Sequence, residues 1–427
     1  MSSPIAPPLS HADWFQAGAV TPVIAAMQGS LILQIAAEVR ELISRGRPVC
    51  NLTVGDFDPK QFPIPALLAE GTNRAVGAGQ TQYPPSEGIP ELRRAISGWY
   101  QRRLGFDAPV ANIVVASGAR PAMYATYRMI LDPGDELVYA VPSWNNGYYG
   151  QLCQAQMVPV VTRPEDDFFP TAALLAPKLR TARLLTLNSP LNPTGTMIGR
   201  EQLAAIATLV AEENRRRGRS SERPLLWMWD QVYWQLTFGP AHHHPSVLVP
   251  EVAPYVITVD AISKAFAATG LRVGWAVAHP YIAERMKSFL GHVGSWAPRP
   301  IQVATAELLD NDVEADRYLR VFRSGLQERL AVIHEALTQA GVVHLAPQGA
   351  MYLSIQLDRL GRPGVGGAPI RNNEDTRRWL LEAAGVAVVP FQAFDLPEDS
   401  GWFRMSIGAV SLPELRAGMA RLVDALR

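Results

Sequence analysis

The chain has 427 residues, of which 48% are hydrophobic and 18% are charged. This length exceeds what one hydrophobic core usually organises, so we expect one large domain and one smaller domain, and the composition excludes extended disorder. Lys+Arg and Asp+Glu both total 39, so the net charge is zero and no broad basic surface for nucleic acid or an anionic membrane is indicated. The expected partners are small molecules or a second copy of the chain.

Segments that direct a protein into or across a membrane are not evident in the sequence. Residues 1–16 lack a basic stretch followed by an apolar run, and no uninterrupted apolar stretch of about 18 residues occurs. Cys50 and Cys153 are the only cysteines and do not form a C-x-x-C pair, so a disulfide framework is not expected. These features predict a cytoplasmic protein.

In chain order, the first regular element is a helix predicted over 31–43, where apolar residues recur at helical spacing. Short apolar runs without in–out alternation then alternate with longer helix-like stretches, which is typical of strands that helices cover on both faces. These predicted strands are IVVAS at 113–117, ELVYAV at 136–141, RLLTLN at 183–188, LLWMWD at 225–230 and YVITVD at 255–260. The pattern predicts an α/β fold with ligand-binding turns at the carboxyl edge of the sheet.

From about residue 301 the pattern changes. A long helix is predicted over 318–340, a short meander includes MYLSIQL at 351–357, and a terminal helix covers about 412–426. We therefore predict an N-terminal arm with part of the small domain at 1–50, a large domain at 51–300 and a small domain at 301–427. GRPGVGGAP at 361–369 is predicted to be a surface loop, and His242–His244 a loop rather than a metal site, because no carboxylate or cysteine spacing accompanies it.

Lysine is rare in this chain, because the basic residues are arginine except at Lys60, Lys178, Lys264 and Lys287. A guanidinium cannot lose its proton near neutral pH and cannot form an imine, so a retained lysine is a candidate for amine chemistry. Chance survival is the simpler explanation for all of these lysines except Lys264.

The segment DAISKAFAATGLRVGW at 260–275 places Ser263 and Lys264 at the end of a predicted strand, with Arg272 eight residues after Lys264. An amine, a hydroxyl and a fixed cation at one edge are what an aldehyde-bearing phosphate cofactor requires. The alternative is a charged turn followed by a helix.

Asp230 ends an apolar predicted strand, where an unpaired carboxylate is costly to desolvate. A protonated pyridine nitrogen is one suitable partner, since a charged ring can accept electron density from a carbanion. Tyr233 follows three residues later and could donate to a phenolate oxygen of such a ring. Asp230 could equally be a structural carboxylate bonded to backbone N–H groups.

Three further turns follow predicted strands. NSPLNPTG at 188–195 presents the Asn192 amide, and SGARPAMYATYRMI at 117–130 starts a helix whose unpaired N–H groups at Ala119 and Arg120 face an anion. Trp144 could stack on a heteroaromatic ring. Taken singly, each has a simpler explanation, as a tight turn, an ordinary helix start or a packed tryptophan.

These segments, in this order, resemble the class I/II aminotransferases, which are enzymes of fold type I that depend on pyridoxal 5'-phosphate (PLP). The resemblance runs from about Asn51 to Arg404, and the pairing of NPTG with SKAFAATGLRVGW carries most of it. It implies a mostly parallel central sheet sandwiched by helices with a smaller α+β domain. It also implies transfer of the α-amino group of an L-amino acid to a 2-oxo acid by a ping-pong mechanism.

By this resemblance, Lys264 is the lysine that forms the Schiff base and shuttles the proton, and Asp230 is the partner of the pyridine nitrogen. Tyr233 and Asn192 match the ligands of the ring hydroxyl, and Trp144 matches the stacking aromatic residue. The implied roles concern the cofactor ring and the reacting carbon.

The resemblance also assigns the phosphate and the substrate carboxylate. The residues that match the phosphate cradle are Ala119, Arg120, Ser263 and Arg272. Tyr83 corresponds to a tyrosine that reaches the phosphate of the neighbouring subunit, which implies a homodimer with shared active sites. Gly55 and Arg404, together with Asn192, match the groups that hold the substrate α-carboxylate.

Two departures from the family pattern bear on specificity. Arg120 stands where many relatives carry other residues, so its side chain is a candidate for an additional role. GDFDPKQFPIP differs from the commoner G-x-P-D-F-x-x-P pattern near the substrate. An acidic donor requires a cation for its distal carboxylate, for which Arg299, after Trp296, is a candidate, whereas the tryptophans favour an aromatic donor.

Other readings of the motifs stay open at this level. A PLP-dependent lyase or synthase could use the same scaffold, because a fold does not determine its reaction. A PLP-binding transcriptional regulator requires an N-terminal DNA-binding domain, and only about 50 residues precede the resemblance. A nicotinamide enzyme is disfavoured because no G-x-G-x-x-G follows a predicted strand.

Overall fold

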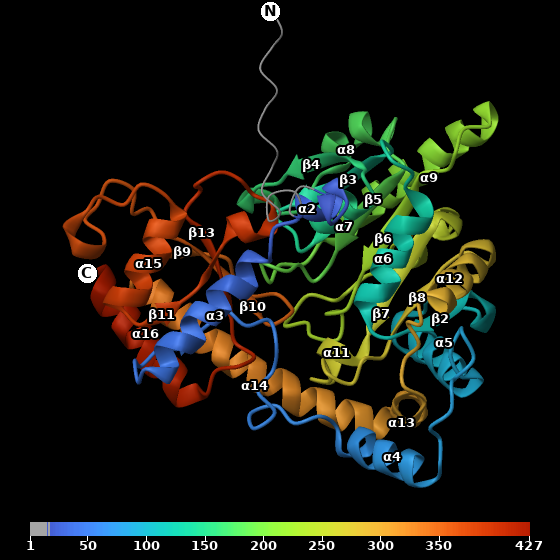
Figure 1. Ribbon diagram of the computed structural model, residues 1–427, viewed down its shortest axis with the longest axis horizontal. Helices are drawn as coiled ribbons and strands as arrows, with labels where there is room; N and C mark the ends of the chain where they lie inside the picture. The colour runs from blue at the N-terminus through green and yellow to red at the C-terminus, as the bar shows by residue number, and fades with distance from the viewer. Residues whose placement is uncertain (1–14, 16–17) are drawn as a thin grey trace, which may run out of the picture.

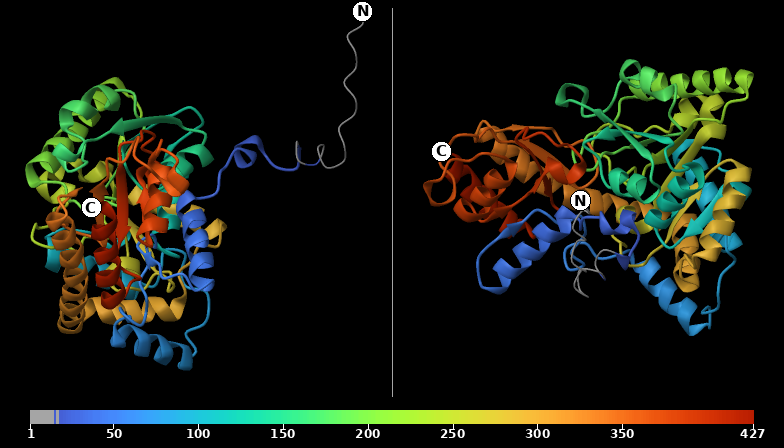
Figure 2. Two further views of the ribbon diagram at one scale, coloured as in Figure 1. Left: turned by 90° about the vertical axis from the view of Figure 1, so that its left-hand side faces the viewer. Right: turned by 45° about the horizontal axis from the view of Figure 1, so that its top comes forward.

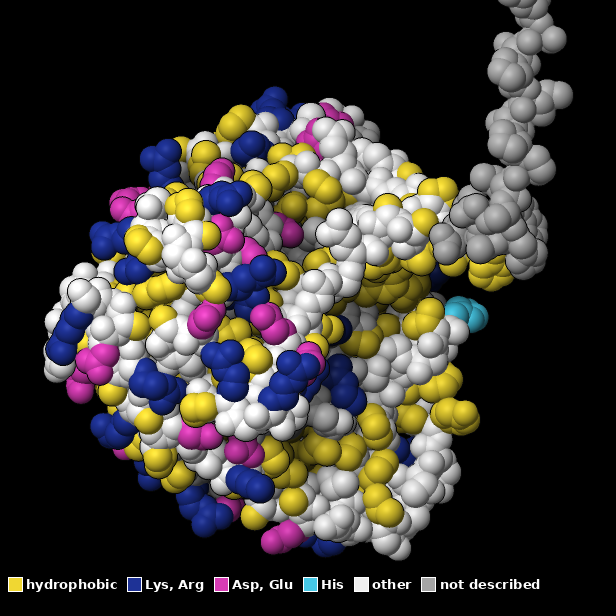
Figure 3. All heavy atoms as spheres, turned by 60° about the vertical axis from the view of Figure 1, so that its left-hand side comes forward, with side chains coloured by type: hydrophobic (Ala, Val, Ile, Leu, Met, Phe, Trp, Pro, Cys, Tyr) yellow, Lys and Arg dark blue, Asp and Glu magenta, His cyan; other side chains and the backbone are white. Residues whose placement is uncertain are grey.

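The computed structural model describes residues 15 and 18–427. The predicted lack of a targeting segment over 1–16 therefore lies outside the described residues, apart from Phe15. Within the described part, no helix combines the length and the apolar character that a membrane crossing requires. Figure 3 shows Lys or Arg and Asp or Glu side chains interspersed over one face of the molecule, as a net charge of zero leads one to expect.

A seven-stranded sheet forms the centre of the larger part of the molecule, drawn mainly in green and yellow in Figure 1. Its strands are β2 (Ile113–Ala116), β3 (Glu136–Val141), β4 (Gln156–Val161), β5 (Leu184–Asn188), β6 (Leu226–Asp230), β7 (Val256–Ala261) and β8 (Gly274–Val277). The spatial order is β2-β8-β7-β6-β5-β3-β4. The strands predicted from apolar runs all form, within one or two residues of the predicted bounds.

Two strands of this sheet were not predicted. β4 includes Pro159 and is half exposed along most of its length, so it lacks the continuous apolar pattern of the inner strands. β8 has four residues and begins directly after the segment that carries Lys264 and Arg272. It pairs antiparallel with both β2 and β7, whereas the other neighbours pair parallel. The sheet is therefore mostly parallel, as predicted, with one reversed strand.

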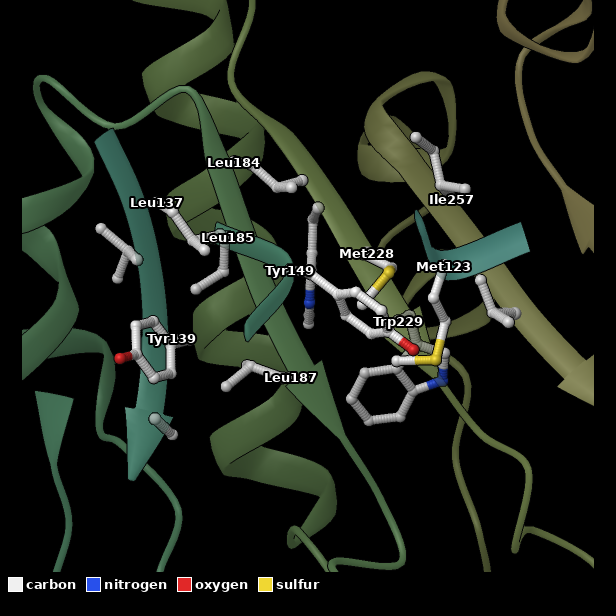
Figure 4. Close-up of a cluster of buried hydrophobic side chains, with 14 of the residues drawn as sticks. Met123, Leu137, Tyr139, Tyr149, Leu184, Leu185, Leu187, Met228, Trp229 and Ile257 are labelled. Carbon is white, nitrogen blue, oxygen red and sulfur yellow. The ribbon is translucent and has the colours of Figure 1, made fainter. Parts of the chain in front are cut away.

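Helices cover both faces of this sheet, which explains why its inner strands are apolar throughout. On and around the sheet lie α4 (Ala66–Gly77), α5 (Pro90–Leu104), α6 (Ala119–Ile130), α7 (Asn146–Leu152), α8 (Ala172–Leu179), α9 (Arg200–Ser220), α10 (Pro245–Leu248), α11 (Ile262–Ala265), α12 (Pro280–His292) and α13 (Arg299–Asp310). Figure 4 shows part of the resulting core, where Met123 of α6 and Tyr149 of α7 gather with Met228 and Trp229 of β6. The predicted helix start at 117–130 is confirmed by α6.

A second, four-stranded antiparallel sheet lies in the part drawn in orange and red in Figures 1 and 2. Its order is β12 (Val389–Pro390), β13 (Trp402–Ser406), β10 (Tyr352–Gln356) and β9 (Val343–His344). The surrounding helices are α14 (Asp312–Gln339), α15 (Asn373–Ala383) and α16 (Leu412–Leu426). The predicted helices at 318–340 and 412–426 both form, although α14 begins six residues earlier than predicted.

The N-terminal segment contacts both parts, through α7 of the larger one and α15 of the smaller one. α2 (Pro22–Ala25) precedes α3 (Leu31–Ser44), the predicted first helix, which buries Ile35, Ala36 and Val39. β1 (Cys50–Asn51) then pairs parallel with β11 (Val386–Ala387). The predicted division into domains at 1–50, 51–300 and 301–427 stays a prediction.

Two predicted loops are loops in the structure. Residues 361–369 are exposed except for a half-buried Gly364, with one short 3-10 turn at Val365–Gly367. In the part of the chain that the structure describes, no group of three or more His, Cys, Asp or Glu is arranged to hold a metal ion, His242–His244 included. His244 is buried against the Phe106 ring, with the two ring centroids 3.8 Å apart, and caps α10 through the Ser246 N–H.

The NPTG turn connects the two parts through Gly195. Its carbonyl accepts hydrogen bonds from the N–H groups of Gln348 and Gly349, both at 2.9 Å. Gly195 has φ +75°, and a Cβ there would lie 2.1 Å from the Tyr352 carbonyl oxygen. Only glycine fits, because both the left-handed backbone and the close approach exclude a side chain.

We expect Gly195→Ala to lower the free energy of unfolding by about 3 kcal/mol, since left-handed strain adds to a clash with rigid backbone. The measurement is urea unfolding followed by circular dichroism. Gly218→Ala is the matched control, because a Cβ at Gly218 in α9 meets nothing within 4 Å and alanine favours helix. Equal unfolding midpoints for the two variants would contradict the close approach at Gly195.

Candidate active site

A cavity of about 470 Å³ opens at the carboxyl edge of the parallel strands, where the sequence places its candidate chemistry. It brings together all but one of the predicted site residues, from segments spread over most of the chain. The predicted residues that line it are Gly55, Ala119, Arg120, Trp144, Asn192, Asp230, Tyr233, Ser263, Lys264, Arg272 and Arg404.

Lys264 lies on the short helix α11, which follows β7 directly. Its Nζ donates to the Gly55 carbonyl oxygen at 2.6 Å. Burial lowers the pKa of Lys264 to about 8; the Asp56 carboxylate opposes this shift, and the nearby arginines, Arg404 first among them, reinforce it. A minority of the amine, about one fifth near pH 7.4, is therefore neutral and nucleophilic, a far larger fraction than for an ordinary lysine.

Asp230 is the last residue of β6 and is 8% exposed. Its carboxylate accepts one backbone hydrogen bond, from the Val232 N–H at 3.1 Å, and no cation of the described residues forms an ion pair with it. Burial raises the pKa of Asp230 to about 6, and the Val232 hydrogen bond opposes the shift. A buried carboxylate with so few partners suits a protonated pyridine nitrogen, so this residue fits PLP.

The start of α6 forms a cradle for an anion. Gly118, with φ +97°, precedes Ala119, and a Cβ at Gly118 would lie 2.3 Å from Nη2 of Arg272. Arg272 is fixed there by donating to the carbonyl oxygens of Thr269 at 2.7 Å and Ser117 at 3.2 Å. The unpaired N–H groups of the first helical turn and this guanidinium together suit a phosphate group.

Arg404, on β13, is 1% exposed and held on several sides. Nη1 donates to Oδ1 of Asn192 at 3.0 Å, and Nη2 donates to the Thr53 carbonyl oxygen at 2.6 Å. Its guanidinium carbon lies 4.7 Å from the ring centroid of Tyr352, and its Nε has no partner among the described residues. The guanidinium is thus prepositioned for a planar carboxylate, while Asn192 keeps its NH₂ group for an oxygen ligand.

Tyr233 and Tyr352 share a hydrogen bond, with their hydroxyl oxygens 2.7 Å apart. Burial raises the pKa of both phenols, so both stay protonated and can donate. Tyr352 was not singled out from the sequence, although it lies in MYLSIQL at 351–357, part of the predicted meander of the small domain. Asp56 was also missed; its Oδ1 accepts from Oγ1 of Thr269 at 2.6 Å, and its position directly after Gly55 was the available signal.

Arg120 and Trp144 pack together inside the cavity. The guanidinium carbon of Arg120 lies 4.4 Å from the centroid of the Trp144 ring. The arginine side chain, and not only its backbone, is therefore part of the cavity wall. A cation beside a flat aromatic face is an arrangement that can receive a second negative charge of a ligand.

Tyr83 is the predicted site residue that lies outside this cavity. It is 81% exposed and makes an edge-to-face contact with Trp296, with ring centroids 5.0 Å apart. Arg299 also lies outside, where its Nε donates to Oε1 of Gln80 at 2.7 Å. Arg299 therefore does not line the cavity of its own chain.

The chain matches the family model of aminotransferase class I and II over residues 47–422, and it therefore belongs to this family. It is 30% identical to an aspartate/prephenate aminotransferase of Thermus thermophilus over 410 residues, covering 94% of this chain and 97% of the relative. It is also 30% identical to an aspartate aminotransferase of Streptomyces avermitilis, covering 94% and 95%. The aspartate aminotransferase structure of Rhizobium meliloti superposes with a TM-score of 0.86 at 27% identity, covering 95% of this chain and 98% of that one.

The protein is thus a PLP-dependent transaminase of fold type I that moves the α-amino group of an L-amino acid to a 2-oxo acid by a ping-pong mechanism. Its substrates are small molecules. The sequence-based predictions of family, fold class, cofactor and reaction are confirmed. The roles of the individual site residues, which these comparisons do not test, are treated as proposals below.

The lowered pKa of Lys264 leads to a prediction for the cofactor-free enzyme. An amine reacts in its neutral form, so acetylation of Lys264 rises with pH around a midpoint near 8, the pKa of this residue. An ordinary lysine is less than about 1% neutral at that pH. The measurement is pulsed acetylation followed by mass spectrometry of the Lys264 peptide.

The same peptide, labelled in urea-unfolded enzyme, is the reference, because unfolding restores solvent to the amine. A midpoint that does not differ between the folded and the unfolded enzyme would contradict the desolvated site.

Proposed function

We propose that Lys264 covalently holds PLP in this cavity and that the preferred amino donor is a dicarboxylic amino acid such as aspartate. The observation that carries the proposal is that the Lys264 amine, which can lose its proton near neutral pH, shares one cavity with the buried, unpaired Asp230 carboxylate and three arginine guanidiniums. When bound, PLP supplies an electron sink for negative charge that develops at the substrate Cα.

The protein's own groups hold and orient the reactants. Arg404, with its free Nε and its Asn192 neighbour, binds the α-carboxylate and fixes the substrate relative to Lys264. The Lys264 amine takes the proton from Cα and later returns a proton, a task for which a pKa near 8 is well matched. Gly55 contributes the carbonyl that receives the amine between these transfers.

The remaining groups hold the cofactor. Asp230 would pair with the ring nitrogen, Tyr233 and Asn192 would hold the ring hydroxyl, and Trp144 would contact the ring. The phosphate-binding groups are the backbone N–H groups of Ala119 and Arg120, the hydroxyl of Ser263 and the guanidinium of Arg272. These roles follow the family resemblance and are supported by the position of every one of these residues in the cavity wall.

The choice of an acidic donor rests on the Arg120 side chain. Arg404 and Arg272 are already engaged by carbonyl and amide oxygens, whereas Arg120 stands over Trp144 with no anionic partner among the described residues. It can therefore bind the distal carboxylate of a donor whose α-carboxylate is held by Arg404. Relatives of this chain are named as aspartate or aspartate/prephenate aminotransferases, which supports the same class of donor.

We expect aspartate to convert the wild-type enzyme in a half-reaction, seen as loss of the visible absorbance of the lysine-bound cofactor, and Lys264→Ala to lack this absorbance. Arg120→Gln is expected to lower the second-order rate for aspartate by about 10- to 100-fold, as the loss of a charged hydrogen bond of roughly 1.5–3 kcal/mol predicts. The measurement is stopped-flow absorbance at several donor concentrations.

Alanine is the matched donor, because it keeps the α-carboxylate and lacks the distal one. Arg120→Gln should change its rate little, and Arg120→Lys should restore part of the aspartate rate by keeping the charge. Equal losses for aspartate and alanine would sink the assignment of Arg120 to the distal carboxylate.

We further propose that the enzyme is a cytoplasmic homodimer with shared active sites. Two buried free thiols, Cys50 and Cys153, suit a reducing compartment. Tyr83 lies outside the cavity of its own chain. Its side chain is exposed and packs edge-to-face on Trp296, which supports its assignment to the phosphate of a second copy. A symmetric dimer would then contain two such composite sites.

Mixed dimers test this assignment. A purified heterodimer of one Lys264→Ala protomer and one Tyr83→Ala protomer contains one site with both native residues, so about half of the wild-type activity per dimer is expected. The two homodimeric variants are expected to be far less active. The heterodimer is isolated by co-expression with two different affinity tags.

A heterodimer no more active than the mean of the two homodimeric variants would show that each site is built within one protomer.

A further inference from the structure

Asp260 is a buried carboxylate that takes no part in the cavity. It is 2% exposed and is the penultimate residue of β7. In the parallel pairing of β6 with β7, Asp230 stands opposite Val259. Because successive side chains of a strand alternate between faces, Asp260 points to the face of the sheet opposite to Asp230. It lies on the side covered by α5 rather than on the cofactor side.

Three donors converge on this carboxylate. Oδ2 accepts from the Tyr100 hydroxyl at 2.8 Å and from Nε1 of Trp234 at 2.7 Å, and Oδ1 accepts from the Ala261 N–H at 2.7 Å. The Tyr100 hydroxyl in turn accepts from Nε1 of Trp275 at 2.8 Å. Burial raises the pKa of Asp260 to about 7, and these donors oppose the shift.

The donors come from the segments that carry the proposed catalytic groups. Trp234 follows Tyr233 directly, in the turn after Asp230. Ala261 is the N-cap residue of α11, which carries Lys264. Asp260 therefore ties the Tyr233 segment to the Lys264 segment from behind the sheet, and Tyr100 anchors both to α5.

We propose that Asp260 is a positioning residue that sets the separation of Lys264 from Tyr233 and thereby the rate of proton transfer. The proposal rests on the roles proposed above for these two residues. Desolvating a carboxylate is costly, so a well-packed core alone gives no reason to keep one here. The Trp234 hydrogen bond instead links the irregular turn after β6 to the end of β7, and the Ala261 N–H bond orients the carboxylate where α11 begins.

The first experiment compares kcat with KM in Asp260→Asn and Trp234→Phe. In Asp260→Asn, the new NH₂ group faces either the Ala261 N–H or the Tyr100 and Trp234 donors, so at least one hydrogen bond is lost. Trp234→Phe removes the Trp234 donor. We expect kcat to fall by at least about tenfold with KM changed by less than about twofold, because small displacements of reacting groups are costly while the Arg404 clamp is untouched.

Trp99→Phe is the matched control for Trp234→Phe. Trp99 belongs to the same buried aromatic cluster, with ring centroids 6.3 Å apart, but forms no hydrogen bond with Asp260. It should lower the melting temperature to a similar degree and leave kcat within about twofold. If the role of Asp260 is purely structural, all three variants will have a lower melting temperature and an unchanged kcat.

The second measurement does not depend on activity or on the cofactor. Hydrogen–deuterium exchange in the cofactor-free Asp260→Asn enzyme should accelerate in residues 231–236 and 261–266 and stay unchanged in β3, which lies at a distance in the same sheet. Uniform acceleration, or none, overturns the proposal.

Failure of the proposed function would look different. If Lys264 were not the cofactor-bearing residue, the Lys264→Ala enzyme would keep its visible absorbance, whereas the exchange pattern of Asp260→Asn would still report whether the two segments are tied together.

Discussion

The desolvation of charged groups at one edge of a parallel sheet is the constraint on which the site depends. Lys264, Asp230 and Arg404 are all shifted by burial toward their neutral forms, and no ion pair among the described residues compensates them. In the proposed roles, the Asp230 and Arg404 charges are complementary to a protonated ring nitrogen and to a carboxylate, whereas Lys264 reacts with a carbonyl carbon as the neutral amine that burial favours. Binding of the ligands therefore relieves a cost that folding imposes.

The sheet explains why much of this site could be predicted. Parallel strands bring their carboxyl ends to one edge, so Asp230 and Lys264, each at or just beyond the end of an apolar run, had to lie near one another. Asn192 and Trp144 follow the ends of β5 and β3 in the same way. The order of the motifs and the family resemblance then indicated a role for each residue. Spacing alone does not give these roles, since a tight turn or a structural carboxylate has the same sequence pattern.

Other parts of the site depend on contacts that no local pattern records. Tyr352 reaches Tyr233 across 119 positions of sequence, from a different sheet. Arg404 reaches Asn192 across 212 positions. The docking of the second sheet places them together, and the left-handed Gly195, whose carbonyl accepts two hydrogen bonds, is one of several contacts that hold it. The antiparallel strand β8 escaped prediction because four residues carry too little periodicity.

Asp230 and Asp260 show how the environment separates two identical side chains. They end neighbouring strands, both are buried, and burial raises the pKa of both. Asp230 has a single backbone donor and faces the cavity, so its remaining lone pairs are available to a ligand. Asp260 has three donors and faces the opposite side, so its lone pairs are largely used within the fold. The number of hydrogen bonds that a carboxylate accepts within the fold, more than its burial or its pKa, thus distinguishes one that can bind a ligand from one that positions neighbouring segments.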